Sequence, residues 1–206
     1  MVNAKEMSDA IPPVFQKPRH IKYWLRCLKT LLPTAYTPND SQRMTFAFFT
    51  LSALDLLSSL EKHTTSEERQ AYAEWIYRCQ HPNGGFKGFT GADAGVETCW
   101  DPANLAATYF ALASLIILED DMQRVQGAQI LSWVRRLQRE DGSFGEALGK
   151  NGEIEGGGDI RYCYLAAAVR FILRRNEDFT QIKDIDIERL VSYVRRSVVC
   201  NSSLFP

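Results

Sequence analysis

The chain of 206 residues has almost no net charge, no long apolar run and no paired cysteines. Its formal charge of -1 argues against a nucleic-acid-binding protein, because phosphate binding requires clustered Lys and Arg. We interpret the basic pairs at residues 135–136 and 174–175 as solvated helix faces. The longest apolar windows, residues 45–57 and 105–118, are shorter than the roughly 20 residues that cross a bilayer, so no membrane-spanning helix is expected.

The cysteines are too scattered for a metal site or a disulfide framework. Neither Cys-x-x-Cys nor His-x-x-x-His occurs, and the nearest approach to a zinc site is Glu97-Thr98-Cys99 with His81 upstream. We expect no zinc there. An odd number of unpaired cysteines predicts reduced thiols in the cytoplasm. The five positions are Cys27, Cys79, Cys99, Cys163 and Cys200.

The first residues contain no continuous apolar stretch of the kind that a signal peptide requires. Residues 1–17 hold charged side chains and two adjacent prolines, which predicts a flexible N-terminal arm. The remainder, residues 18–206, is predicted to form one domain.

That domain contains a repeated phrase. Residues 80–86 read Gln-His-Pro-Asn-Gly-Gly-Phe and residues 138–144 read Gln-Arg-Glu-Asp-Gly-Ser-Phe, 58 positions later. The agreement extends upstream, since Trp75 precedes Trp133 by the same distance. A repeat of this length that ends in a turn is typical of an array of helix pairs.

Apolar segments alternate with half-polar ones along the array. An amphipathic helix at residues 21–31, stopped by Pro33, stands before the repeats. Three apolar helices follow, and the first is apolar on nearly every side and is expected to be buried all round. They are predicted at residues 45–57, from Asp101-Pro102 to Leu118, and after Asp159 through residues 164–173.

Each apolar helix is followed by a charged partner. The first partner opens with Thr65-Ser66-Glu67-Glu68, which has the form of a capping box. The other two are predicted at residues 121–137 and 185–199. The economical packing places the apolar set in an inner ring around a cavity and the half-polar set in an outer ring. The sequence thus predicts an all-α fold, an α–α toroid of helical hairpins, here about half a barrel.

The glycine turns have a structural role in this arrangement. Gly84-Gly85 and Gly142 are expected to adopt positive φ, while Phe86 and Phe144 fill the layer beneath. Residues 145–158, rich in glycine and without apolar periodicity, are expected to form a mobile surface loop.

The repeated phrase resembles the repeat shared by protein prenyltransferase β subunits and, with Trp in place of Phe, by squalene and oxidosqualene cyclases. Both families build α–α barrels around an apolar cavity. A cyclase needs an Asp-rich acid motif, and neither residues 119–122 nor residues 184–186 reproduce one. Three separated phrases are most similar to the β subunit of protein geranylgeranyltransferase type I, at residues 41–55, at residues 104–109, and at residues 141–144 together with 159–164.

The resemblance implies an isoprenoid site that includes Thr45 and Tyr164. Farnesyl-transferring relatives place Trp at the position of Thr45, so Thr implies room for one more isoprene unit, stabilised by about 25 cal/mol per Å² buried. The alternative is that Thr45 is simply a small core residue.

The resemblance also implies a binding site for the end of a peptide substrate. Arg161, in an otherwise apolar helix, would lie near the terminal carboxylate, or would pair instead with Asp159 or Glu155. The pocket for the last residue would be apolar and would favour Leu or Phe, although Asn104 departs from the His of some relatives. The residues implied for this peptide site are Phe49, Asn104, Ala106, Arg161 and Tyr162.

The complete enzyme of this family attaches geranylgeranyl from its diphosphate to the Cys of a C-terminal C-a-a-X motif, which zinc holds as a thiolate. The resemblance thus implies a prenyltransferase α subunit and C-a-a-X proteins such as small GTPases as partners. The zinc ligands and the diphosphate-binding cluster of the family belong to the second half of its barrel, and no catalytic or metal-ligating residue of this chain matches them.

We therefore expect this chain to be an N-terminal portion of a β subunit, inactive alone, with apolar surface exposed at the open end of the half barrel. The alternatives are a farnesyltransferase or Rab-type β subunit, a terpene cyclase and a non-catalytic helical scaffold. An Asp-x-Cys phrase and a distant His encoded downstream of Pro206 would favour the transferase.

Overall fold

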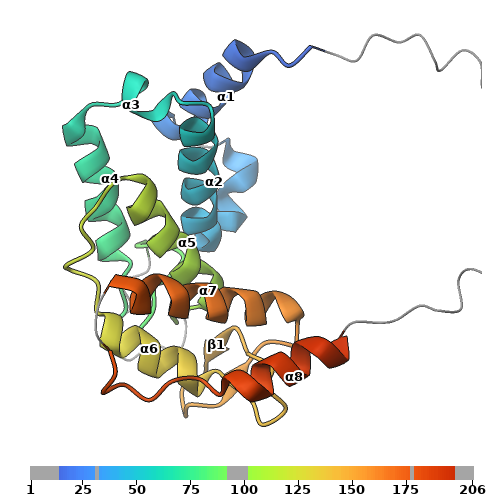
Figure 1. Cartoon of the computed structure of the whole chain (residues 1–206). Coiled ribbons are helices and arrows are strands. Elements are labelled where there is room, and N and C mark those ends of the chain that lie inside the picture. Colours follow the sequence, from blue (N-terminus) through green and yellow to red (C-terminus); the bar gives the residue numbers. More distant parts are fainter. Residues whose placement is uncertain (1–13, 31–32, 92–101, 177–178, 198–206) are drawn as a thin grey trace, which may run out of the picture.

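Helices dominate the computed structural model, which describes residues 14–30, 33–91, 102–176 and 179–197 (Figure 1). Within these residues the elements are α1 (Lys17–Lys29), the 3₁₀ segment η1 (Thr34–Gln42), α2 (Arg43–Leu56), α3 (Leu60–His63), α4 (Ser66–Arg78), α5 (Leu105–Ile117), α6 (Gly127–Arg136), β1 (Ala147–Leu148), β2 (Ile154–Glu155), α7 (Ile160–Asn176) and α8 (Ile187–Ser197).

The helices form two layers, as the alternation of apolar and half-polar segments predicts. The inner helices α2, α5 and α7 pack side by side in that order, and α4, α6 and α8 lie outside them (Figure 1). The central helix α5 is the most apolar, and seven of its thirteen residues are buried. The core lies between the layers, so the predicted all-α array of helical hairpins is confirmed.

One face of the inner layer is open, which corrects the expectation that α2 is buried all round. Exposed apolar side chains recur seven residues apart on α2, at Phe49 and Leu56, and on α7, at Tyr164 and Phe171, and residues seven apart lie about 20° from each other around an α-helix. They therefore form one continuous apolar surface, which we call the inner face. Its exposed members are Phe49 and Leu56 on α2, Ile116 on α5, and Ile160, Tyr164 and Phe171 on α7.

The Gln of each repeat holds the start of the next outer helix. The Gln80 side chain donates to the Arg124 carbonyl at 3.1 Å and accepts from the Gln126 N–H at 2.9 Å, just before α6. The Gln138 side chain makes the same pair of bonds with both backbone groups of Asp186, at 2.8 and 2.7 Å, just before α8. Each repeat is thus tied to its successor by one amide side chain.

The positive φ predicted for the repeat glycines is confirmed. Because these residues have no side chain, the backbone of the next outer helix can also approach them closely. Gly84 has φ +102° and Gly142 has φ +91°. A Cβ at Gly84 would lie 2.6 Å from the carbonyl oxygen of Gln129, and one at Gly142 would lie 2.1 Å from that of Arg189. These carbonyls belong to the third residues of α6 and α8. The turn therefore presses against the next outer helix, while Phe86 and Phe144 are fully buried as expected.

The segment expected to be a mobile loop is instead ordered by strand pairing. Strands β1 and β2 form an antiparallel hairpin in which Ala147 pairs with Glu155. Single antiparallel bridges continue the ladder from Ala147 to Asn104 and from Asn104 to Phe86. The prediction of a loop rested on the glycine content of the segment. The two strands are too short to produce a recognisable alternation of apolar and polar residues in the sequence.

Several helix ends differ from the prediction. The α5 helix begins at Leu105 with Asn104 as N-cap, because the Asn104 side chain accepts from the Ala107 N–H at 2.7 Å. The α6 helix begins six residues later than expected, since Met122 adopts positive φ and interrupts the segment. The capping box at Thr65 and the cap at Asp159, which accepts from the Arg161 N–H at 2.8 Å, are confirmed.

Residues 1–13 of the arm predicted at residues 1–17, the segment with Glu97, Cys99 and Asp101, and Cys200 lie outside the described residues. Cys27, Cys79 and Cys163 form no disulfide. Among the residues that the structure describes, no helix has the length and apolar character needed to cross a membrane.

Candidate functional site

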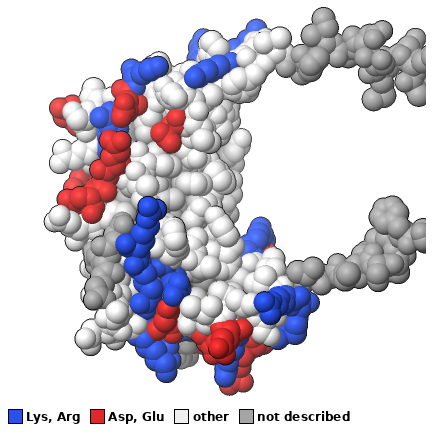
Figure 2. Space-filling view, viewed as in Figure 1, with Lys and Arg blue, Asp and Glu red and all other residues white. Residues whose placement is uncertain are grey.

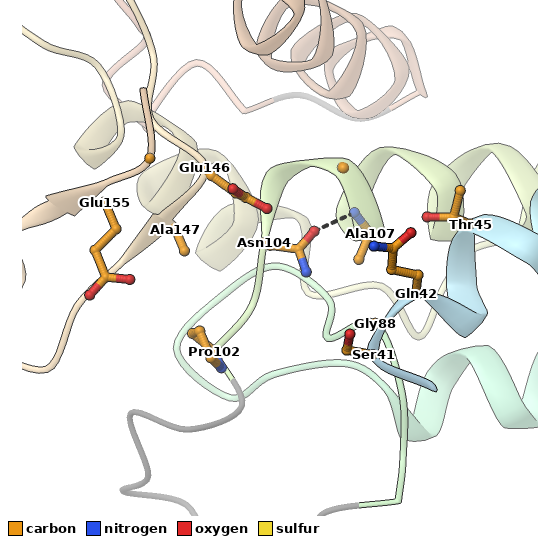
Figure 3. A pocket seen from close by; sticks show the side chains of 12 residues that line it. Ser41, Gln42, Thr45, Gly88, Pro102, Asn104, Ala107, Glu146, Ala147 and Glu155 are labelled. Atoms are coloured by element: carbon orange, nitrogen blue, oxygen red, sulfur yellow. Dashed lines mark hydrogen bonds between the residues drawn. The ribbon is translucent and has the colours of Figure 1, made fainter. Parts of the chain in front are cut away.

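A cavity of about 500 Å³ lies between the start of α2, the start of α5 and the β1–β2 hairpin (Figure 3). Three of the residues implied by the sequence, Thr45, Asn104 and Ala106, line it together. The other lining residues are Ser41, Gln42, Gly88, Pro102, Ala107, Glu146, Ala147, Glu155 and Gly156.

The local backbone fixes these three residues. Thr45 lies in the first turn of α2, where the Met44 N–H donates to the Gly88 carbonyl at 2.9 Å and joins the helix to the loop after the first repeat. Asn104 uses its side chain as the cap of α5, so its amide oxygen is already occupied. Its backbone N–H donates to the Phe86 carbonyl at 3.1 Å. Asn104 is thus held at the edge of the cavity by its cap bond and by the bond to Phe86.

Two carboxylates reach this cavity that the sequence reasoning did not select, Glu146 and Glu155 (Figure 3). The Glu146 backbone is anchored on both sides, because its carbonyl accepts from the Leu105 N–H and its N–H donates to the Glu155 carbonyl. Its carboxylate accepts from the Tyr162 hydroxyl at 2.8 Å. Burial, followed by this bond to Glu146, raises the pKa of Tyr162 to about 12. The expected apolar pocket therefore has an acidic wall.

The inner face beside the cavity carries a cluster of aromatic rings. Phe48 stacks on Phe110 with ring centroids 4.9 Å apart, and Phe49 meets Phe110 edge-on at 5.7 Å. The Tyr109 and Tyr164 rings are 5.7 Å apart and their hydroxyl oxygens are 3.0 Å apart. The bond to Tyr164, followed by burial, raises the pKa of Tyr109 to about 12. This cluster joins α2, α5 and α7 into one aromatic surface.

The cluster contains Phe49 and Tyr164, two further residues implied by the sequence. The exposed fraction is 48% for Phe49 and 60% for Tyr164, so both present ring surface. Aromatic faces of this size suit an apolar chain that lies along them. The inner face is thus chemically competent to hold an isoprenoid.

The expectation that Arg161 is a costly cation inside an apolar helix is wrong. Arg161 lies in the first turn of α7, and its side chain is 83% exposed. It pairs with Asp159, with nitrogen-to-oxygen distances of 2.7 and 2.9 Å, and this contact holds the pKa of the Asp159 carboxyl below its usual range. The sequence analysis named this ion pair as the alternative. Arg161 is therefore exposed to solvent in the first turn of α7, and it does not line the cavity.

The described residues do not fit a zinc ion. No group of three or more His, Cys, Asp and Glu side chains among them is placed to hold a metal.

The prenyltransferase α–α toroid domain matches residues 15–204. The chain belongs to this family. The layered helices and the open inner face are accordingly a part of the toroid that gives the family its name.

The toroid domain is similar to β subunits of protein prenyltransferases. It is 29% identical to the β subunit of geranylgeranyl transferase type-1 of Arabidopsis thaliana over 77% of this chain and 44% of that protein. It is 30% identical to the Dictyostelium discoideum protein of the same name over 84% of this chain and 52% of that protein. The chain therefore spans about half the length of these relatives.

Other comparisons agree with the fold. Farnesyltransferase β of Pyricularia oryzae is 25% identical over 78% of this chain and 28% of its own length. In a solved structure of Candida albicans protein geranylgeranyltransferase-I complexed with GGPP, one chain superposes with a TM-score of 0.76. That match is 24% identical and covers 89% of this chain and 51% of the other, so it supports the fold alone.

Proposed function

We propose that this chain forms part of the β subunit of a protein geranylgeranyltransferase type I. The enzyme would transfer geranylgeranyl from its diphosphate to the Cys of C-terminal C-a-a-X proteins. The observation that carries the proposal is the small side chain of Thr45 at a cavity that lies beside an exposed aromatic surface. The similarity to two geranylgeranyl transferase type-1 β subunits supports the same reading.

The residues of the candidate site would bind two ligands, the isoprenoid and the end of the peptide substrate. The aromatic cluster, with Tyr164 at its exposed side, would hold the isoprenoid, and Thr45 would leave space for its last unit. The peptide end would lie by Phe49, Asn104, Ala106 and Tyr162, with Arg161 near the terminal carboxylate. Glu146 would position Tyr162 through the hydroxyl bond at 2.8 Å.

The remaining parts of the proposal concern the complete protein. Zinc would be supplied with ligands beyond the described residues, and it would hold the substrate Cys as a thiolate. A prenyltransferase α subunit and small GTPases would be the protein partners. Cys27 and Cys163, which form no disulfide, support a cytoplasmic location. We also retain the division into an arm at residues 1–17 and a toroid domain at residues 18–206.

The decisive experiment replaces Thr45 with Trp in the full-length gene product assembled with its α subunit. Filling the space of one isoprene unit should remove roughly 2–4 kcal/mol of apolar binding, because each buried CH₂ contributes about 0.8 kcal/mol. We expect T45W to weaken binding of geranylgeranyl diphosphate at least tenfold, with little effect on farnesyl diphosphate, as measured by displacement of a fluorescent isoprenoid.

The control is Thr45→Ser, which keeps the site small and should retain the preference for the longer chain. A protein that binds neither diphosphate would contradict the proposal and favour a helical scaffold. Equal weakening of both ligands by T45W would contradict the role of Thr45 in chain length.

A further inference from the structure

The helix that precedes the repeats carries a one-sided charge that the proposed function does not use. In its thirteen residues α1 has five Lys and Arg and no Asp or Glu. The basic residues are Lys17, Arg19, Lys22, Arg26 and Lys29.

Three of these cations share one side of the helix. Arg19, Lys22 and Arg26 follow i, i+3 and i+7 spacing, so they lie within about 60° of one another around the axis. The opposite side, with Trp24, Leu25 and Leu28, packs against the core. We call the surface formed by Arg19, Lys22 and Arg26 the basic face. The basic face points away from the core, because the opposite side of α1 packs against the core.

Among the residues that the structure describes, none neutralises the basic face. All three side chains are exposed, and no ion pair among the described residues includes them. Lys29, at the edge, pairs with Glu68 of α4 at 3.1 Å and helps to attach α1 to the toroid. Figure 2 shows Lys and Arg without intervening Asp or Glu on the rim where Figure 1 places α1.

Exposed apolar groups flank the same face. Val14 and Phe15 precede the helix with 79% and 64% of their surfaces exposed, and the Phe15 ring stacks on His20 at 4.8 Å. Tyr23 is also exposed, and Arg26 lies over its ring at 5.7 Å from the centroid. Aromatic and aliphatic tips beside a run of cations are the combination that rests in the headgroup region of an anionic bilayer.

We propose that α1 docks the protein on anionic lipid surfaces through its basic face, with Phe15 and Tyr23 entering the headgroup region. The contact is peripheral and reversible, since it uses three cations and two rings. It does not rest on the proposed function, although an enzyme that takes a lipid diphosphate and releases a lipidated protein would work beside such a surface. An acidic protein would offer charge to the cations, but it would not account for the exposed Val14 and Phe15.

The test is sedimentation of the full chain with phospholipid vesicles. Each basic residue near an anionic surface contributes about fivefold in affinity, so Arg19→Gln/Lys22→Gln/Arg26→Gln should lower the partition coefficient about 100-fold. We expect binding to vesicles of phosphatidylcholine with about one third phosphatidylserine, loss of that binding at high salt, and little binding to phosphatidylcholine alone. Phe15→Ala/Tyr23→Ala should weaken binding further.

A matched control removes the same charge elsewhere. Arg135→Gln/Arg136→Gln/Arg195→Gln alters three exposed cations of α6 and α8 and should leave sedimentation unchanged. Equal loss in both triple variants, or equal binding to neutral vesicles, would overturn the proposal. So would an α1-dependent complex with soluble polyglutamate in the absence of vesicle binding, which would assign the face to an acidic protein instead. Circular dichroism verifies that each variant is folded.

Discussion

At the residue scale, the glycines of this chain have very different neighbours. Gly142 combines a left-handed backbone with a carbonyl of α8 directly against its Cα, whereas an added Cβ at Gly157 would meet nothing within 4 Å. Sequence alone predicts the conformational role of Gly142 from its place in the turn. It does not reveal the approach to Arg189, because that contact joins residues 47 positions apart.

Gly142→Ala should therefore destabilise the protein strongly. The left-handed conformation costs an L side chain about 1–2 kcal/mol, and the overlap with the Arg189 carbonyl raises the total to roughly 3 kcal/mol. Gly157→Ala should change the free energy of unfolding by less than about 0.5 kcal/mol. Urea denaturation measures both, and similar values for the two variants would contradict the close approach.

Tyr109 and Tyr162 should lose their hydroxyl protons at a higher pH than an ordinary tyrosine does. The pKa of Tyr109 and that of Tyr162 are each raised to about 12 in the folded protein from an ordinary value of 10. The neutral hydroxyls thus contribute stability that is complete below pH 10 and is lost as the pH rises toward 12. The tyrosinate absorbance of the folded chain should show a phase near pH 12 that Y109F and Y162F each reduce. Tyr36→Phe, an exposed tyrosine outside the site, serves as the control and should leave that phase intact.

At the element scale, the pattern of the sequence predicts which segments are helical but not how they are fastened. The apolar and half-polar helices follow from periodicity, and the capping box of α4 follows from Thr65 and Glu68 alone. The bonds of Gln80 and Gln138 to the next outer helix link residues 44 to 48 positions apart. Gln recurs in both copies of the repeated phrase, but this recurrence does not identify the backbone groups to which its side chain bonds.

Removing one of these amides should loosen the junction between repeats. Gln138→Ala deletes two hydrogen bonds to backbone groups of Asp186, and we expect a loss of about 1–2 kcal/mol of unfolding free energy. Gln80→Ala should cost a similar amount, and the two losses should add because the sites are separate. Gln181→Ala, an exposed glutamine in the loop before α8, is the control and should be nearly neutral. A neutral Q138A would show that the junction does not depend on this side chain.

The same limit applies to the candidate site. The resemblance of the sequence assigned Thr45 to an isoprenoid site and Asn104 and Ala106 to a peptide site, and the structure places all three at one cavity. It missed Glu146 and Glu155, because their segment has no period and reaches the cavity only through the ladder that joins Ala147 to Asn104. It also misplaced Arg161 by treating the whole of α7 as enclosed, whereas the first turn is in solvent.

At the scale of the whole molecule, the inner face determines behaviour in solution. Three inner helices present apolar side chains on one side, and Phe49 and Tyr164 are two of the exposed ones. Contiguous apolar surfaces of this kind bind partners, ligands or other copies of the chain. The described part of the toroid should therefore be sensitive to amphiphiles.

We expect the chain to bind a hydrophobic fluorescent dye while fully folded. Phe49→Glu/Tyr164→Glu should reduce the bound fluorescence roughly by half, because charge at two points interrupts the inner face. Val191→Glu on the outer helix α8, also an exposed apolar position, is the matched control and should leave the fluorescence unchanged. Absence of dye binding by the folded wild-type chain would contradict an accessible inner face.

The bonds that join each repeat Gln to the following outer helix have a consequence for the order of assembly. The turn at residues 80–86 can complete its contacts only after Gln126 and Gln129 have left the ribosome, and the turn at residues 138–144 must wait for Asp186 and Arg189. Each of these two hairpins is therefore completed by the one synthesised after it. During translation these repeats would therefore be completed in order from the N-terminus, each one after the following outer helix has been synthesised.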